Sequence, residues 1–557
     1  MPNPGYTAIP EPGAVGASAA PLPSALGGVG PSYFSGALLL FTDRPPLLQQ
    51  RLDALAPESL ANLRRGIEKE SLRVRPDGSL ATTPHPAALG SALTHPLVTT
   101  DFSESQVELI TGVHPDPRSC LAELVEIHQA VYRAIGDELL WAASMPCRLP
   151  ADDAIPIGRY GTSNVGRAKS VYRMGLAHRY GRRMQTISGI HYNFSWPQPL
   201  GNDDYFGLIR NFRRESWLLL YLFGASPAVC GSFVAGRAHE LEHYSDDTLY
   251  LPYATSLRMG RLGYQSDAQS SLAVSYNGLD GYAASLHEAM TKPYPAYAAV
   301  GIRDGDDYRQ LADSMLQIEN EFYGTIRPKR RIRPGERPLH ALRQRGVEYV
   351  EVRLMDLDPF CAVGIDDDTM RFLDVFLMHC LLRDSPPDTR QELAAVVGNK
   401  QRTASRGREP GLLLTRGVEQ VSLIDWGADL LAQCEPIAAA LDAACEKVHG
   451  AAHDPGAHAR AHAMAISRLR DPETTPSARV LQAMQRDFAE SYVRFVLAQS
   501  LRHRDSIWKL PYPHELANRV ARLAEGSLVK QRQIEAADTI PFEIYRQQYL
   551  SADRLNV

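Results

Sequence analysis

The feature that most constrains the fold is residues 66–74 (GIEKESLRV), where side chains alternate with the period of a β-strand. Because alternate residues of a strand share a face, Glu68 and Glu70 project together, on the same side as Leu72 and Val74. Two carboxylates on one apolar-lined face repel each other unless a cation lies between them, and Mg²⁺ takes oxygen ligands of this kind. The segment therefore fits either a metal-binding strand or a strand with a solvated face.

Strand-like patterns are concentrated in the first two thirds of the chain. Residues 184–195 and 347–355 are predicted strands, whereas residues 45–63 and 117–143 are predicted helices. From about residue 415 to 550, helix-compatible segments dominate. This distribution predicts an α+β fold with a helix-rich C-terminal portion, and we find no internal repeat.

Composition divides the chain into a tail and a body. Residues 1–42 contain one charge, Glu11, and are rich in Pro, Gly and Ala, which predicts a disordered N-terminal tail without the marks of a signal or transit peptide. No charged or Ser/Gly-rich linker divides residues 43–557, so one large domain is expected. Residues 216–236 carry no charge, but glycine, proline and serine interrupt them, which favours a buried helix and a turn over a membrane span.

The charge and cysteine content exclude several classes of partner. A net charge of -5 lacks the basic excess of nucleic-acid binders, and the basic segment 327–333 is interpreted as an anion-facing loop. The seven cysteines are scattered and form no C-x-x-C pair, which favours the reducing cytoplasm. No carboxylate or cysteine completes a metal site near the four histidines between His449 and His462, so we expect them to be exposed and not to bind zinc.

Two further segments carry charges that could serve chemistry. Glu351 and Arg353 share one strand face, which suits phosphoryl transfer, although a plain cross-strand salt bridge is the alternative. Asp101 and Glu108 bracket a polar turn in which Glu104 is expected to be the exposed member. No P-loop and no G-x-G-x-x-G after a strand is present, so any nucleotide must be held in another way.

Several long segments, all in one order, resemble bacterial glutamate–cysteine ligase. They are RGIEKESLRVRPDGSLATTPHPAALGSALTHPLVTTDFSE (65–104), YGTSNVGR, RYGRRMQTISGIHYNFS, YLFGASPAVC, LPYATSLRMG, QIENEFY and VEYVEVR. The match runs from about residue 50 to Phe542 and leaves out residues 1–42.

The resemblance implies ATP-dependent ligation of the γ-carboxylate of L-glutamate to the amine of L-cysteine through γ-glutamyl phosphate, the first step of glutathione synthesis. It implies Mg²⁺ as cofactor, with Mn²⁺ as a second candidate, and a cup-shaped, mainly antiparallel sheet flanked by helices, as in glutamine synthetase. Residues 43–557 would then be a single catalytic domain of a cytoplasmic, monomeric enzyme. Its partners would be glutamate, cysteine and ATP, with feedback inhibition by glutathione and no nucleic acid or membrane.

The resemblance also assigns roles residue by residue. The implied metal ligands are all carboxylates: Glu68, Glu70, Asp101, Glu108 and Glu351. Arg353 would lie at the transferred phosphate and act in catalysis with Glu68 and Glu351. Arg173 and Arg258 would hold the carboxylates of glutamate, because a guanidinium offers a bidentate fork. His191 would lie at the nucleotide or metal site. The implied cysteine pocket is aromatic: Phe102, Tyr172, Tyr264 and Tyr323.

Two other functions stay open at this stage. One is a glutamate ligase that uses a different amine, for which the carboxylate cluster would be unchanged. The other is a non-catalytic sensor of ATP or glutathione, which has no physical need to keep repulsive carboxylates together.

Overall fold

The computed structural model describes residues 47–245, 247–263, 272–333, 335–450 and 453–555. Residues Pro46–Val557 form one compact unit of mixed helices and antiparallel sheets. The predicted tail over residues 1–42 lies outside the described residues.

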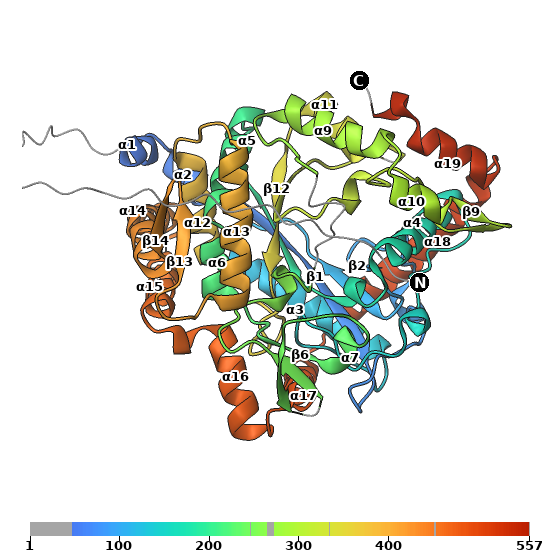
Figure 1. The fold of residues 1–557 in the computed structure, drawn as a ribbon, viewed down its shortest axis with the longest axis horizontal. Helices are drawn as coiled ribbons and strands as arrows, with labels where there is room; N and C mark the ends of the chain where they lie inside the picture. Colours follow the sequence, from blue (N-terminus) through green and yellow to red (C-terminus); the bar gives the residue numbers. More distant parts are fainter. Residues whose placement is uncertain (1–46, 246, 264–271, 334, 451–452, 556–557) are drawn as a thin grey trace, which may run out of the picture. The chain divides into compact units, whose positions relative to one another are not determined.

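The main sheet is antiparallel, with the strand order β11-β12-β5-β1-β3-β2 and with β4 paired to β1 (Figure 1). Its strands are β1 (Arg64–Val74), β2 (Val98–Thr100), β3 (Gln106–Ile110), β4 (Leu139–Leu140), β5 (Ile190–Ser195), β11 (Ile326–Lys329) and β12 (Tyr349–Met355). The smaller sheets are formed by β6 (Ala228–Cys230), β7 (Glu242–Ser245) and β8 (Thr248–Tyr250), by β9 (Arg303–Asp304) and β10 (Asp307–Tyr308), and by β13 (Leu413–Arg416) and β14 (Glu419–Ser422).

Helices before residue 410 surround these strands. They are α1 (Leu47–Asp53), α2 (Pro57–Leu60), α3 (Pro117–Ala134), α4 (Asn164–Tyr180), α5 (Asn202–Glu215), α6 (Trp217–Phe223), α7 (Gly231–Val234), α9 (Leu279–Thr291), α10 (Pro295–Val300), α11 (Pro338–Arg345), α12 (Asp367–Leu382) and α13 (Arg390–Arg406).

The C-terminal portion is helical, as predicted. After β14 the chain continues in α14 (Leu423–His449), α15 (Ala457–Arg470), α16 (Pro476–Asp487), α17 (Tyr492–Trp508), α18 (His514–Ala537) and α19 (Phe542–Leu550). In Figure 1 the orange helices α14 and α15 lie on the left and pack against α12, whereas α13 packs against α6. The expected α+β fold with an antiparallel sheet and flanking helices is confirmed.

Two predicted elements are shorter than the sequence pattern indicated. The helix expected over 117–143 ends at Ala134, because Gly136 takes a positive φ of 63° and the chain then turns into β4. The strand expected over 184–195 begins only at Ile190, since Met184–Thr186 forms one turn of 3-10 helix.

Two predictions of exposure are wrong. Glu104 is buried, and its carboxylate accepts hydrogen bonds from the backbone N–H groups of His85 and Arg159. His458 and His462 are also buried: the first bonds to Asp442 and the second donates to a backbone carbonyl of α14. In each case the partners come from segments distant in sequence, so the local pattern could not show them.

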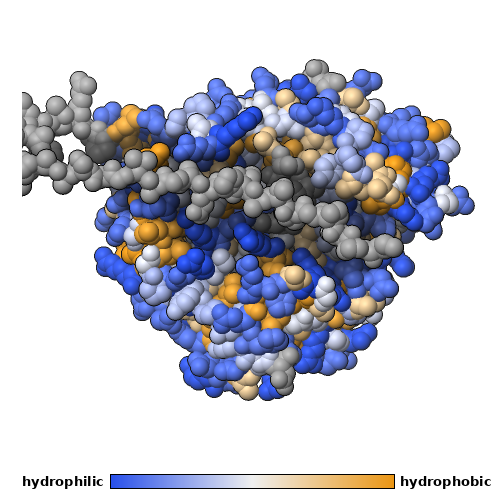
Figure 2. Space-filling view, viewed as in Figure 1, coloured by the Kyte–Doolittle hydropathy of each residue, from blue (hydrophilic) through white to orange (hydrophobic). Residues whose placement is uncertain are grey.

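The uncharged segment 216–236 forms a buried helix, as expected. Every residue of α6 is buried, and the chain then turns into β6. Among the described residues, no helix is both long and apolar enough to cross a membrane. On the face seen in Figure 2, hydrophilic side chains predominate and apolar ones form small separate patches.

The two faces of β1 have different neighbours. On one face Arg65 forms a buried ion pair of 2.8 Å with Asp374 of α12, and Lys69 Nζ lies 2.7 Å from Nε2 of His128 on α3. Helices therefore close this face of the sheet. The opposite face carries Glu68 and Glu70, which line a cavity.

Replacing Lys69 with Met is expected to remove a pH dependence of stability. Burial lowers the pKa of Lys69 to about 7 in the folded chain, against about 10.4 for an exposed lysine. At pH values between these two pKa values, Lys69 is protonated in the unfolded chain but not in the folded chain. The free energy of unfolding of the unsubstituted chain should therefore rise with pH, relative to the variant, by up to about 1.4 kcal/mol per unit.

Urea unfolding at several pH values across this window measures the difference between the two slopes. The control is Lys292→Met, because Lys292 is exposed directly after the end of α9 and, among the described residues, its side chain bonds only to Glu288. Parallel stability profiles for the Lys69 variant and the unsubstituted chain would show that Lys69 stays protonated when folded.

Candidate active site

A cavity of about 250 Å³ lies on the face of the main sheet that carries Glu68 and Glu70. It is lined by every predicted site residue that the structure describes: Glu68, Glu70, Asp101, Phe102, Glu108, Tyr172, Arg173, His191, Arg258, Tyr323, Glu351 and Arg353. The remaining predicted residue, Tyr264, lies outside the described residues. The fold thus gathers segments that are up to 285 residues apart in sequence (68 to 353).

Strand register places the carboxylates side by side. Glu70 of β1 is directly opposite Glu108 of β3, and Glu68 is directly opposite His191 of β5. Like charges directly opposite in an antiparallel pair are destabilising. The sheet therefore holds these two carboxylates together against their repulsion.

His191 connects the carboxylates of β1 and β12. One ligand atom each from Glu68, His191 and Glu351 lies within 4.8 Å of the others. The ring nitrogen Nδ1 of His191 is 3.2 Å from Glu68, and Nε2 is 3.6 Å from Glu70. Burial, together with the nearby Arg353, lowers the pKa of His191, so the neutral ring is favoured.

Two carboxylates of the cavity, Glu70 and Glu108, ionise less readily than free glutamate. Burial, with Asp101 close by, raises the pKa of Glu70 to about 8. Burial and the charges of Glu68 and Asp101 raise the pKa of Glu108 well above its usual range. A hard divalent cation such as Mg²⁺ prefers carboxylate oxygens and would offset this repulsion, so the donor set fits such an ion.

Fixed cations stand beside the acidic cluster. The carboxylate of Glu351 is fully buried, 3.0 Å from Lys329 Nζ and 2.9 Å from Arg353 Nη1. Although burial opposes ionisation, these two cations hold the pKa of Glu351 well below its usual range. The cross-strand salt bridge considered as an alternative does form, between Lys329 of β11 and Glu351 of β12, and it lines the cavity together with the Glu351–Arg353 pair within β12.

Arg258 is held rigidly at the wall of the cavity. Its guanidinium donates to the backbone carbonyl of Arg353 at 2.9 Å and lies 3.8 Å from Asp356. It also covers Gly189, where a Cβ atom would be only 2.0 Å from Arg258 Nη2. Only glycine leaves room for the guanidinium in this position.

Tyr160 supports the loop that carries Asp101, a role that the sequence did not reveal. Its buried hydroxyl lies 2.6 and 2.7 Å from the carbonyl oxygens of Thr100 and Asp101, to which it donates. Its ring supports the guanidinium of Arg173 at 4.5 Å, and Arg173 itself donates to the carbonyl of Asp101. Tyr160 therefore positions both an acidic and a basic residue of the cavity.

Tyr160→Phe is expected to lower kcat/KM by about tenfold for the substrate that Arg173 is predicted to bind, since one buried hydrogen bond contributes about 1–1.5 kcal/mol. Steady-state kinetics and the melting temperature measure the effect. Tyr221→Phe is the matched control, because Tyr221 is buried on α6 and, within the described part of the chain, its hydroxyl bonds only to a carbonyl of α15. Equal kinetics in the two variants would rule out the positioning role.

The sequence also missed several other residues of the cavity. Arg327 and Lys329 belong to the basic segment predicted to be a loop, but both lie on β11 and line the cavity, whereas Arg331 is exposed and pairs with Glu348. The alternation of Arg327 and Lys329 is the signal that could have found them. Gln185 donates to the Tyr323 hydroxyl at 2.7 Å. Two lysines from helices also line the cavity, with no motif to mark them: Lys169 and Lys400.

A larger cavity, of about 1,090 Å³, continues along the same face of β1. Arg64, Gly66 and Glu68 alternate on this face, and Glu68 lines both cavities. The other residues of the larger cavity include basic and aromatic side chains: Arg330, Arg331, Arg343, Arg345, Trp196 and Tyr349. The acidic cluster therefore lies where the two cavities meet.

Clustered carboxylates beside fixed arginine and lysine, between two cavities, are typical of enzymes that transfer a phosphoryl group between two substrates. Residues 48–403 match the model of one family, glutamate-cysteine ligase. The chain belongs to this family.

Similar proteins cover almost the whole chain. The glutamate–cysteine ligase of Alcanivorax borkumensis is 47% identical over 90% of this chain and 99% of its own length. That of Pseudomonas fluorescens is 46% identical over 90% of this chain and 96% of its own length. The crystal structure of glutamate–cysteine ligase from Francisella tularensis in complex with AMP has a TM-score of 0.83 at 35% identity, covering 89% of this chain and 98% of that one.

A bifunctional glutathione synthetase from Pasteurella multocida shares the fold alone. Its TM-score is 0.65 at 24% identity, and the match covers 86% of this chain and 58% of that one.

Proposed function

We propose that this chain ligates the γ-carboxylate of L-glutamate to the amine of L-cysteine, with ATP converted to ADP and phosphate. The observation that carries the proposal is the position of Glu68 at the junction of two cavities, one of which is lined by the described site residues. Membership of the glutamate-cysteine ligase family supports it.

The chemistry requires activation of the carboxylate. A carboxylate does not react with an amine, so its oxygen first attacks the γ-phosphorus of ATP and the bond to the β-phosphate oxygen breaks. The amine nitrogen then attacks the acyl carbon of γ-glutamyl phosphate, phosphate leaves, and the nitrogen loses a proton. Each step concentrates negative charge, which the cavity must neutralise.

The metal ligands in this proposal are Glu68, Glu70, Asp101, Glu108 and Glu351, with His191 beside them. Their crowded oxygens suit Mg²⁺, and Mn²⁺ shares this preference. When bound, the ion would neutralise charge on the phosphates and align the reacting groups. Arg353 would then face the transferred phosphoryl group, since it lies beside Glu351 and His191 at 2.9 and 3.4 Å.

The two cavities suggest separate places for the substrates. In the smaller one Arg173 and Arg258 would bind the carboxylates of glutamate, and Phe102, Tyr172 and Tyr323, with Tyr264, would form the cysteine pocket. In the larger one the arginines would bind phosphates, while Trp196 and Tyr349 offer ring faces to a base. The phosphoryl group would pass between them at Glu68.

The proposal includes the cytoplasm as location, a monomeric state and inhibition by glutathione, which shares the γ-glutamyl group with the product. Other amines are the second candidate, because the acidic cluster does not depend on which amine attacks. A non-catalytic sensor is the weaker alternative, because it has no need to keep a complete set of mutually repelling carboxylates.

The test is ADP release by the purified chain with Mg²⁺, ATP and glutamate, with and without cysteine, and with the product identified by mass. Cysteine-dependent release with γ-glutamylcysteine as product is the expected result. ADP release only with another amine would identify that amine, in place of cysteine, as the substrate. The absence of release with any amine would overturn the enzyme assignment.

A further inference from the structure

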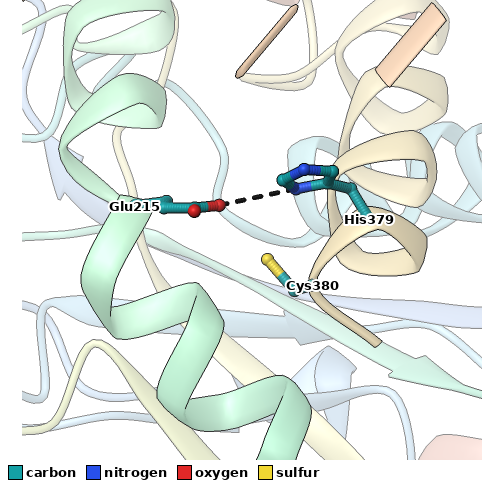
Figure 3. Close-up of side chains that lie close together, drawn as sticks. All are labelled: Glu215, His379 and Cys380. Atoms are coloured by element: carbon teal, nitrogen blue, oxygen red, sulfur yellow. Dashed lines mark ion pairs between the residues drawn. The ribbon is translucent and has the colours of Figure 1, made fainter. Parts of the chain in front are cut away.

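A second cluster of possible ligands lies away from the cavities, among the helices (Figure 3). It consists of Glu215, at the end of α5, and of His379 and Cys380 on α12. One ligand atom from each lies within 4.8 Å of the others, and all three residues are buried. None of them lines either cavity described above.

The hydrogen bonding of this cluster is incomplete. Nε2 of His379 is 3.3 Å from the side-chain oxygen of Gln433 on α14, to which it donates, so the proton of a neutral ring is on Nε2. Nδ1 then presents a lone pair to a carboxylate oxygen of Glu215, 3.4 Å away. Within the part of the chain that the structure describes, neither atom has a hydrogen-bond partner. Two facing lone pairs in a buried site call for a positive species between them.

The spacing suits a tetrahedral metal ion. Metal bonds of about 2.1 Å that meet at the tetrahedral angle separate two ligand atoms by roughly 3.4 Å, as found for Glu215 and His379. In Figure 3 the carboxylate points toward the imidazole ring, with the sulfur of Cys380 beside them. Carboxylate oxygen, imidazole nitrogen and thiolate sulfur are ligands that Zn²⁺ accepts, whereas Mg²⁺ does not favour sulfur.

The charges around the cluster also agree with a bound dication. Arg383 already forms an ion pair with the second oxygen of Glu215. The carboxylate of Glu215 and a thiolate at Cys380 together balance the two positive charges of a divalent ion. Without an ion the thiol of Cys380 stays protonated, because burial and the nearby Glu215 raise its pKa.

We propose that Glu215, His379 and Cys380 form a structural site for Zn²⁺ or a similar thiophilic divalent ion, distinct from the acidic cluster of the active site. Binding would replace the thiol proton of Cys380, which is released to solvent, by a metal–sulfur bond. The ion would tie the end of α5 to α12, which also carries Asp374, the partner of Arg65 in β1.

Co²⁺ is the probe, because a cobalt–thiolate bond gives a charge-transfer absorption band that oxygen and nitrogen ligands do not give. The full chain is produced in minimal medium with Co²⁺ or Zn²⁺, so that the buried site can load during folding. We expect about one tightly held ion per chain after gel filtration without chelator, a thiolate–cobalt band, and a higher melting temperature than for chain produced without these metals.

Single substitutions test whether the retained metal is bound at Glu215, His379 and Cys380 or elsewhere in the chain. Cys380→Ser should abolish the thiolate–cobalt band, and His379→Gln should lower the retained metal at least about tenfold. The matched control is Cys445→Ser, a buried cysteine of α14 outside the cluster, which should leave the band unchanged. Glu68→Gln should also leave it unchanged, because no cysteine is among the residues that line the active-site cavity.

Three results would overturn the proposal. One is the absence of retained metal in the unsubstituted chain, which would leave a proton on Glu215 as the species that faces His379. Another is retained Co²⁺ without a thiolate band. The last is a band that persists in Cys380→Ser. The unsubstituted chain alone decides the first two, so a variant that fails to fold does not block the test.

Discussion

Glu351→Gln is expected to lower kcat by about 10²–10³-fold or more while the chain stays folded. The amide keeps the shape of the side chain but removes the charge that Lys329 and Arg353 now face at 3.0 and 2.9 Å. The proposed metal site would lose a ligand, and Arg353 would lose the partner that orients it. Turnover at saturating substrates and the melting temperature with and without Mg²⁺ measure the two effects.

Glu409→Gln is the matched control for this variant. Glu409 lines neither cavity and pairs with Arg406, whose side chain is 55% exposed, so its loss should change turnover by less than about twofold. The Glu351 variant should also lose most of the stabilisation that Mg²⁺ gives to the unsubstituted chain. Full turnover of Glu351→Gln would remove Glu351 from the catalytic machinery.

Gly189→Ala is expected to lower kcat/KM for glutamate by about 10²-fold, although the substitution adds one methyl group. The new Cβ would be 2.0 Å from Nη2 and 2.5 Å from Cζ of Arg258. That guanidinium is buried and held by the carbonyl of Arg353, so it cannot move aside without losing its position. If Arg258 binds substrate as proposed, displacing it by about 1 Å can reduce the rate this much, and overpacking should cost about 1–3 kcal/mol of stability.

A double-mutant cycle with Arg258→Lys tests whether the effect passes through Arg258. If it does, adding Gly189→Ala to the lysine variant should cost much less than it costs alone. Gly526→Ala is the control, because a Cβ at this position of α18 meets no atom within 4 Å and should leave the kinetics unchanged. Additive losses in the cycle would mean that Gly189 acts by another route.

Much of the site could be predicted from the sequence, because strand alternation is a local property. The pattern around Glu68 and Glu70 placed both carboxylates on one face, and the structure has both on the cavity side of β1. The same reasoning placed Glu351 and Arg353 together on β12. The roles assigned to these residues through the family resemblance remain proposals.

Residues outside a motif could not be predicted in this way. Tyr160 supports Asp101 and Arg173 through two backbone carbonyls and a ring face, contacts that leave no pattern in the sequence. Lys400 reaches the cavity from α13 because that helix packs against α6 and the turn that carries Arg258. Glu104 was expected to be exposed in a polar turn. It is buried instead, and its carboxylate accepts hydrogen bonds from two backbone N–H groups of other segments.

The sequence by itself determined the elements and their faces: an α+β chain, the strands with paired carboxylates, and a helical C-terminal portion. These follow from side-chain periodicity, which the backbone geometry of a strand or helix imposes over a few residues. Only the tertiary structure decided that Glu70 stands opposite Glu108, that Glu68 joins two cavities, and that Glu215 meets His379. Strand register and helix packing depend on burial summed over the whole core, which no local pattern contains.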